Sequence, residues 1–401
     1  MESIETPIDK KIFAALFFSL FAAVTGVGIV VPLLPVYAHS LGASGFYIAL
    51  IFGGFSATRT LFLPWFGRLS DQKGRKPFIT FGLFCYFLVS LAFMVFADIH
   101  SLILLRALQG VASAMILPVA QAYIGEITPI GKEGFSMGVF NVSVFSGLSI
   151  GPLMGGVIKD AFSLQAAFGC MGALSFGAFC FSFFLLPPRR MEKSHARDGA
   201  PVPWARLTRD RGLIAIFFFQ MAYTTCIGII WGFLPVYADS RFALSSAAIG
   251  LLVVTGVSVN GIMNIPMGMI SDSMDKRLLV AAGGIVTLAA ISLIGPAAGF
   301  WGLFTANVVF GIGGGISMPA LMALAVITGN RLGAMGAVMS LVTVAHSLGM
   351  LCGSLIAGVI MDTLALQYAF YAGGVIMGLG TMAFVLGMSV GSQKQRVRDE
   401  G

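Results

Sequence analysis

Long apolar runs recur along the whole chain, and each is about as long as a helix that crosses a lipid bilayer. A helix rises about 1.5 Å per residue, so about 20 residues span a hydrocarbon core of about 30 Å. Runs of this length predict a polytopic, all-α membrane protein with twelve transmembrane helices. The predicted helices cover approximately residues 12–36, 46–66, 78–97, 101–124, 134–157, 166–187, 212–236, 246–267, 278–297, 302–327, 334–360 and 368–389.

The composition excludes a soluble protein. Of the 401 residues, 57% are apolar and only 10% are charged. A soluble domain cannot hide so much apolar surface, because its exterior must still meet water. The five cysteines all fall within apolar runs and form no CxxC pair, so neither a disulfide framework nor a zinc site is indicated. We therefore expect no metal and no cofactor.

Basic residues gather on one side of the predicted helices. With a cytoplasmic N-terminus, all but four of the 24 lysines and arginines lie in cytoplasmic segments. Lys159 and Arg241 lie on the opposite side, and Arg59 and Arg106 lie within helices. This asymmetry follows the positive-inside rule, so we expect a multi-pass protein of the cytoplasmic (inner) membrane with both termini cytoplasmic. It also explains the net charge of +7 without a nucleic-acid partner.

Short motifs repeat at a constant offset of 200 to 202 residues, which indicates an internal duplication. The sequence therefore predicts two pseudo-symmetric six-helix bundles, 1–187 and 212–401, joined by a polar cytoplasmic linker, 188–211. Paired halves of this kind place a substrate site near the bilayer midplane and expose it alternately to the two sides. The repeated segments are 34–38 with 234–238, 67–71 with 268–272, Pro118 with Pro319, and 156–160 with 358–362.

The densest charge lies between the second and third predicted helices, in GRLSDQKGRKPFI, residues 67–79. An ordinary positive loop explains its lysines and arginines, but not Asp71 and the two spaced glycines. The segment resembles the corresponding loop of major facilitator superfamily transporters, which implies the major facilitator fold. The resemblance rests on Gly67, Arg68, Asp71, Gly74, Arg75 and Lys76.

The same resemblance implies a conformational latch. In the family, a carboxylate at the position of Glu126 pairs with a basic residue of this loop, and Arg75 is the candidate partner here. Asp71 is expected near the cytoplasmic start of the predicted helix 334–360, where the positive end of the helix dipole would stabilise it. These contacts would stabilise the outward-open state. The alternative is that Glu126 is a solvated acid at a helix end.

The fourth predicted helix begins LILLRALQG, and Arg106, Gln109 and Gly110 resemble the R-x-x-Q-G pattern of the same family. Arg106 and Gln109 are three residues apart and therefore share a helix face. An arginine within a membrane helix usually faces protein or a wet cavity, because its insertion is unfavourable by about 2.5–3.5 kcal/mol. The alternative is that the side chain of Arg106 snorkels to the interface.

The fifth predicted helix contains GLSIGPLMGG. Glycines four residues apart form a smooth stripe on which another backbone can pack closely, and this packing alone is the alternative explanation. The full pattern resembles the motif that is typical of proton-driven antiporters, drug exporters above all. The residues that carry it are Gly147, Gly151, Pro152, Gly155 and Gly156.

Few other polar side chains lie within the predicted membrane helices. Each is either a substrate-cavity residue or a hydrogen-bonding contact between helices. His346 is a candidate proton carrier, and a neutral, hydrogen-bonded histidine is the alternative. No acid lies between Phe13 and Val36, which favours neutral, lipophilic or anionic substrates over organic cations. The candidate cavity residues are Arg59, Arg106, Gln109, Asn141, Gln220, Tyr223, Asn260, Asn307 and His346.

Together these features predict a secondary transporter that exports small compounds in exchange for protons. The alternative is an uptake symporter for an organic acid or metabolite, with Arg59 and Arg106 holding the anion. An intramembrane hydrolase is disfavoured, because the sequence lacks HExxH and paired aspartates. We expect a monomer, not an enzyme, whose partners are the bilayer and a small-molecule substrate.

Overall fold

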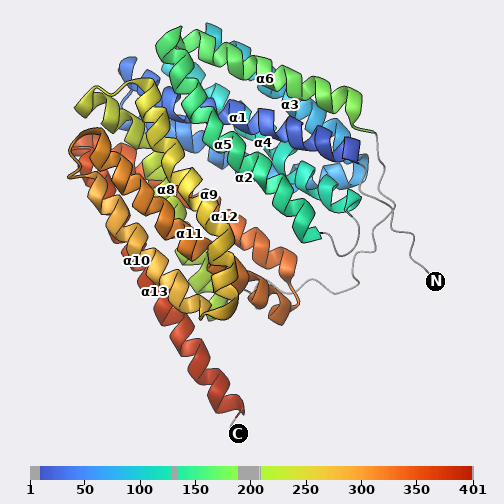
Figure 1. The fold of residues 1–401 in the computed structure, drawn as a ribbon, viewed down its shortest axis with the longest axis vertical. Coiled ribbons are helices and arrows are strands. Elements are labelled where there is room, and N and C mark those ends of the chain that lie inside the picture. The colour runs from blue at the N-terminus through green and yellow to red at the C-terminus, as the bar shows by residue number, and fades with distance from the viewer. Residues whose placement is uncertain (1–9, 129–132, 188–206, 208, 400–401) are drawn as a thin grey trace. The chain divides into compact units, whose positions relative to one another are not determined.

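The computed structural model describes residues 10–128, 133–187, 207 and 209–399. Within these residues the chain forms twelve long α-helices and no strand (Figure 1). All twelve are long and apolar enough to cross a membrane, so the predicted all-α membrane fold is confirmed. The helices are α1 (Lys10–Ser40), α2 (Gly45–Lys73), α3 (Arg75–Val95), α4 (Ile99–Ile127), α5 (Glu133–Ala161), α6 (Leu164–Leu185), α8 (Arg211–Phe242), α9 (Ser246–Ser273), α10 (Lys276–Ile294), α11 (Gly299–Leu332), α12 (Met335–Thr363) and α13 (Gln367–Asp399).

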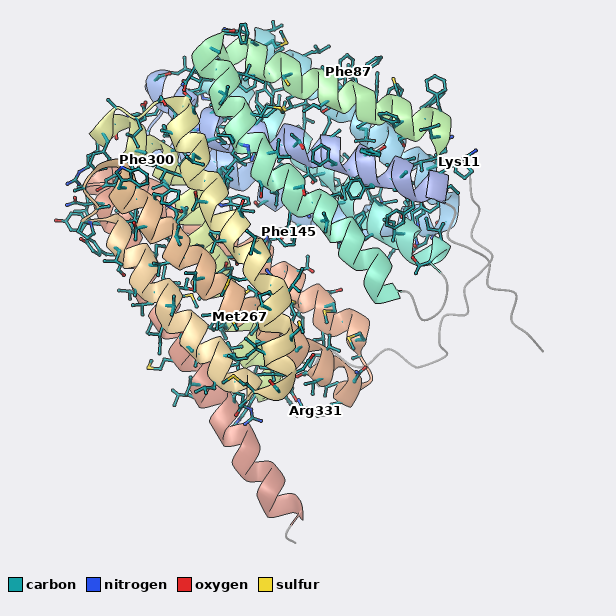
Figure 2. The ribbon with its side chains drawn as sticks, viewed as in Figure 1. Lys11, Phe87, Phe145, Met267, Phe300 and Arg331 are labelled. Atoms are coloured by element: carbon teal, nitrogen blue, oxygen red, sulfur yellow. The ribbon has the colours of Figure 1, made fainter. Side chains whose placement is uncertain are left out.

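Apolar side chains cover the outward faces of these helices (Figure 2). Phe145 of α5 is 39% exposed, and Trp301 and Ile262 are each 73% exposed. Exposure of so much apolar surface is unfavourable in water, whereas contact with lipid acyl chains is not. The helical backbone satisfies its own hydrogen bonds, which a chain inside the bilayer requires.

The chain divides into two compact units. Unit 1 comprises Met1–Gly42, Gly54–Ala196 and Ser245–Val254, and unit 2 comprises Ala43–Gly53, Arg197–Leu244 and Thr255–Gly401. Unit 1 therefore holds α1, most of α2, α3 to α6 and the first turns of α9. Unit 2 holds the first turns of α2, the remainder of α9, α8 and α10 to α13. The predicted bundles 1–187 and 212–401 stay a prediction, and most of the predicted linker lies outside the described residues.

Unit 1 is built around α1, which packs against α5 and α6. Leu16 and Leu20 of α1 are almost fully buried with Tyr123 of α4 in one apolar cluster. α3 packs along both α4 and α6. The hydroxyl groups of Thr80 and Ser182 lie 2.6 Å apart and join α3 to α6 inside this core.

Unit 2 is built in the same way around α8, which packs against α12 and α13. The rings of Phe219 on α8 and Phe384 on α13 are both buried, with centroids 5.5 Å apart. At the other end of α8, the Tyr237 hydroxyl donates a hydrogen bond of 2.8 Å to the carbonyl oxygen of Gly295. The central helix of each unit is largely buried, so polar side chains on it need partners within the protein.

The charged segment 67–79 is helical on both sides of a sharp corner, which differs from the loop that the sequence predicts. α2 continues through the charged residues to Lys73, and α3 begins at Arg75. Gly74 alone joins the two helices, with φ +91° and ψ 156°. Only glycine adopts this backbone conformation readily, because it has no Cβ atom. The corner therefore fixes the direction in which α3 leaves α2.

Candidate functional site

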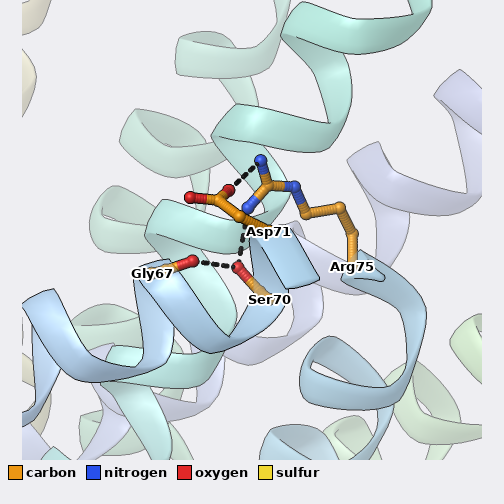
Figure 3. Close-up of polar contacts among 4 residues, drawn as sticks. All are labelled: Gly67, Ser70, Asp71 and Arg75. Carbon is orange, nitrogen blue, oxygen red and sulfur yellow. Dashed lines mark hydrogen bonds and ion pairs between the residues drawn. The ribbon is translucent and has the colours of Figure 1, made fainter. Parts of the chain in front are cut away.

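The corner between α2 and α3 carries a short network of polar contacts (Figure 3). Arg75 forms an ion pair of 2.5 Å with the Asp71 carboxylate and donates a hydrogen bond of 2.7 Å to the Ser70 hydroxyl. The Ser70 hydroxyl in turn donates to the carbonyl oxygen of Gly67 at 2.8 Å. Arg75 is only 7% exposed, whereas the Asp71 side chain is 54% exposed. The guanidinium is thus held against the end of α2 by a carboxylate and a hydroxyl.

The contacts of the predicted latch are only partly described. Arg75 contacts Asp71, whereas the sequence predicts Glu126 as its partner; the Glu126 side chain lies outside the described residues. Arg68 is exposed on α2. Lys76 lies 5.9 Å from the centroid of the Phe183 ring on α6. The proposed role of this segment as a latch stays a prediction.

Arg106 lies inside unit 1 and is only 2% exposed. Its Nη1 atom donates a hydrogen bond of 2.7 Å to Oε1 of Gln109, one turn along α4. Its guanidinium lies 4.6 Å from the centroid of the Phe55 ring on α2. A cation over an aromatic face gains electrostatic stabilisation, and more so where water is excluded. The amide oxygen of Gln109 and the Phe55 ring therefore offset part of the unfavourable burial of this charge.

Gly110 allows α2 to pack closely against α4, so that the Phe55 ring of α2 reaches Arg106. A Cβ atom at this position would overlap the Thr58 hydroxyl and the carbonyl oxygen of Phe55. The Thr58 hydroxyl also donates a hydrogen bond of 2.8 Å across to the carbonyl oxygen of Ala107. The glycine of the R-x-x-Q-G pattern thus permits the helix contact that places the Phe55 ring beside the arginine.

A second arginine lies in the same unit. Arg59 lies on α2, and its Nε atom is buried and makes no hydrogen bond. Tyr86 of α3 is hydrogen-bonded to Ser113 and lies within electrostatic reach of both Arg59 and Arg106. Unit 1 therefore holds the buried Arg106 and Tyr86 together with the half-buried Arg59.

The glycines of α5 lie against the backbone of α1. A Cβ atom on Gly151 would lie 2.5 Å from the carbonyl oxygen of Thr25 and 2.8 Å from Cα of Gly28. A Cβ atom on Gly155 would lie 3.0 Å from Cα of Ile29. Real Cβ atoms almost never lie as close as 2.5 Å to such atoms, so a side chain at Gly151 would push α1 away, whereas one at Gly155 would require a smaller shift. The predicted antiporter residues adjoin α1 or α9: Gly147, Gly151 and Gly155 face α1, Pro152 borders Gly28, and Gly156 faces the start of α9.

Unit 2 holds a neutral polar cluster on α8 and α9. The Asn260 amide donates a hydrogen bond of 2.8 Å to the Tyr223 hydroxyl, and the Asn264 amide donates one of 2.7 Å to Oδ1 of Asn260. The Tyr223 ring stacks on Phe310 of α11, with centroids 5.7 Å apart. A Cβ atom on Gly314 would overlap both Tyr223 and Asn260, so the glycine leaves room for the cluster.

Gln220 and Asn307 lie in unit 2 outside the Tyr223–Asn260–Asn264 cluster. Oε1 of Gln220 is buried and makes no hydrogen bond, and the Asn307 amide donates to the carbonyl oxygen of Leu303 on its own helix. His346 is half-buried on α12. The side chain of Asn141 lies outside the described residues.

Two carboxylates that the sequence places at helix ends make contacts that sequence reasoning missed. In unit 1, Asp160 at the end of α5 accepts hydrogen bonds from the backbone amides of Ser246 (3.1 Å) and Ala247 (2.7 Å), at the start of α9. In unit 2, Asp362 at the end of α12 accepts from the amides of Gly45 (2.6 Å) and Phe46 (2.8 Å), at the start of α2. The repeat of 156–160 at 358–362 was the available signal.

Comparisons with known proteins agree with this arrangement. The family model described as Major Facilitator Superfamily matches residues 16–241 and 216–400. An uncharacterised major facilitator-type transporter of Methanocaldococcus jannaschii is 26% identical over 91% of this chain and 95% of its own length. The quinolone resistance protein NorA of Staphylococcus aureus is 26% identical over 88% of this chain and 91% of its own length.

The fold has solved counterparts as well. The crystal structure of the D323A mutant of the nucleoside transporter NupG matches with a TM-score of 0.78 and 13% identity, over 94% of this chain and 99% of that one. The predicted family resemblance and the predicted major facilitator fold are thus both confirmed. The chain belongs to the major facilitator superfamily of membrane transporters.

Proposed function

We propose that the protein exports small lipophilic, neutral or anionic compounds in exchange for protons by alternating access. The observation that carries the proposal is the buried guanidinium of Arg106, held by Gln109 and the Phe55 ring. Arginine keeps its charge in proteins, so this position stays positive throughout a transport cycle. A fixed positive charge favours electron-rich or anionic substrate groups and disfavours organic cations.

The α5 glycines support export rather than uptake. Their pattern resembles the antiporter motif, and in this chain the glycines bring α5 against α1. The relative NorA is named for quinolone resistance, as expected of an exporter. In unit 2, the hydroxyl and amides of Tyr223 and Asn260 offer neutral hydrogen bonds to a substrate. We infer that substrates contact this cluster during the cycle.

The proposal extends to coupling and topology. His346, half-buried on α12, is the proposed proton carrier, because imidazole is the side chain most often used to take up and release protons under physiological conditions. The corner of Asp71 and Arg75 is proposed to stabilise one conformation of the cycle. The protein is proposed to act as a monomer in the cytoplasmic membrane, with both termini cytoplasmic.

Uptake of an organic acid is the second candidate function. The buried Arg106 and the half-buried Arg59 favour it, because two guanidinium groups in one unit suit a carboxylate. The two functions differ in the direction of transport and not in the chemistry of the site.

A susceptibility screen tests the proposal. A host without its own exporters is challenged with cationic, neutral and anionic compounds, with and without the protein. We expect the protein to protect against lipophilic neutral or anionic compounds, and Arg106→Ala to abolish protection at unchanged membrane abundance.

The conservative change and a control sharpen the screen. Arg106→Lys keeps the charge but loses the planar guanidinium, so we expect the apparent Km for transport to rise several-fold. Arg331→Ala is the matched control, because Arg331 is half-exposed and pairs with Asp210 far from Arg106 in the sequence. Protection that survives Arg106→Ala, or that is confined to organic cations, would refute the proposal.

A further inference from the structure

Two apolar grooves flank α3 on the outer surface of unit 1. The larger, of about 610 Å³, lies between α2, α3 and α4 and includes Trp65, Cys85 and Leu108. The smaller, of about 470 Å³, lies between α3 and α6 and includes Phe84, Phe179 and Phe183. Figure 1 shows α3 and α6 side by side. Both grooves are lined almost entirely by carbon atoms, as lipid-facing surface requires.

The grooves converge at one end of α3. Pro77 and Phe81 line both grooves. The two grooves therefore run along opposite sides of α3 and come closest to each other at its first turns. The larger groove continues along α3 to Val89, a rise of about 18 Å from Pro77 at 1.5 Å per residue. One leaflet of the hydrocarbon core is about 15 Å deep, half of about 30 Å. The larger groove thus has the depth of a single leaflet.

A cation stands where the grooves meet. Lys76 lines the smaller groove and lies 5.9 Å from the Phe183 ring centroid. The neighbouring Arg75 is buried and is held by Asp71 and Ser70. The segment 67–79 carries four basic residues and one acid, so the mouth of the grooves is positively charged.

We propose that an anionic phospholipid binds specifically at this place. Its phosphate contacts Lys76, one acyl chain lies in the groove between α2, α3 and α4, and the other lies in the groove between α3 and α6. The two apolar grooves match the two acyl chains of such a lipid, and Lys76 beside their common end matches its single charged headgroup. Basic pockets between membrane helices are a general mode of anionic-lipid recognition. The site shares Lys76 with the segment proposed as a latch, but lipid binding does not require the proposed transport function.

Native mass spectrometry of the purified full chain tests the headgroup contact. Dioleoyl phosphatidylglycerol and dioleoyl phosphatidylcholine carry the same chains, so only the headgroup differs. We expect the wild type to retain phosphatidylglycerol about fivefold better, from about 1 kcal/mol per lysine. Lys76→Gln should remove the preference. The matched control is Arg277→Gln, because Arg277 lies in the first turn of α10 at the repeat offset and donates a hydrogen bond to the carbonyl oxygen of Met388.

Equal retention of the two lipids by the wild type would overturn the proposal. A preference for phosphatidylglycerol that survives Lys76→Gln would also overturn it. The same holds for a preference that Arg277→Gln removes equally, because the lipid would then respond to the overall charge of the protein and not to Lys76.

A labelling experiment on the wild type tests the groove and does not depend on how the variants fold. Cys85 lines the larger groove, whereas Cys170 of α6 lines neither groove, and both are partly exposed. In detergent, phosphatidylglycerol should slow the reaction of Cys85 with an apolar maleimide and leave Cys170 unchanged. Equal rates at Cys85 with and without the lipid would place the acyl chain elsewhere and overturn the proposal.

Discussion

Replacing Gly151 with alanine tests whether direct backbone contact between α5 and α1 holds unit 1 together. The new Cβ atom would lie 2.5 Å from the Thr25 carbonyl oxygen and 2.8 Å from Cα of Gly28, both of which are backbone atoms with little freedom to move. Overpacking of this kind destabilises by about 1–3 kcal/mol. Alanine regains up to about 1 kcal/mol of helix propensity over glycine. We therefore expect a net loss of roughly 0–2 kcal/mol for Gly151→Ala relative to the wild type, and a larger loss for Gly151→Leu.

The assay compares apparent melting temperature in detergent with transport in cells at matched membrane abundance. Gly177→Ala on α6 is the control, because no atom lies within 4 Å of a Cβ atom placed there. Gly151→Ala should melt several degrees below Gly177→Ala, and Gly151→Leu should lose transport. If Gly151→Leu transports normally and melts like the wild type, α1 and α5 do not meet at this glycine, and the support for export from this motif falls.

Three further changes test the corner and the helix-end carboxylates. Gly74→Ala should lower the melting temperature, because φ +91° strains alanine by about 1–3 kcal/mol, whereas Gly67→Ala should not. Asp362→Ala should destabilise by about 0.5–2 kcal/mol through two lost acceptors at the start of α2, and Asp362→Asn by less; equal melting of both variants and the wild type would contradict this. Asp71→Asn should change stability by at most about 1 kcal/mol, because its ion pair with Arg75 is half-exposed, yet should reduce transport strongly. Normal transport at equal abundance would leave the corner without a conformational role.

The number of transmembrane segments and their helical conformation could be predicted from the sequence, because the bilayer restricts both. A run of about 20 apolar residues has few stable alternatives to a helix inside a membrane. The helix ends could not be predicted equally well. Hydropathy places the end of the second helix near residue 66, but the backbone hydrogen bonds of α2 continue through charged residues to Lys73. A charge on an exposed helix end is tolerated, so charge does not mark where the helix stops, whereas the positive φ of Gly74 does.

Local contacts within the candidate sites could be predicted, and contacts distant in sequence could not. A spacing of three residues predicts that Arg106 and Gln109 share a face, and they are hydrogen-bonded. The bond from Asn260 to Tyr223 joins two helices and depends on their packing. Likewise, Asp362 is recognisable as an acid at a helix end, but its partner Gly45 lies 317 residues away. Spacing on one helix carries no information about which other helix a side chain will meet.

Export driven by a proton gradient is the central claim, and inverted membrane vesicles measure its direction. These vesicles are acidic inside when energised, and an exporter then carries its substrate into the lumen as protons leave. A lipophilic neutral or anionic compound identified by the susceptibility screen should accumulate inside vesicles that contain the protein, and a protonophore should abolish the accumulation. Release of preloaded compound driven by the same gradient would show uptake by symport instead, and would contradict export.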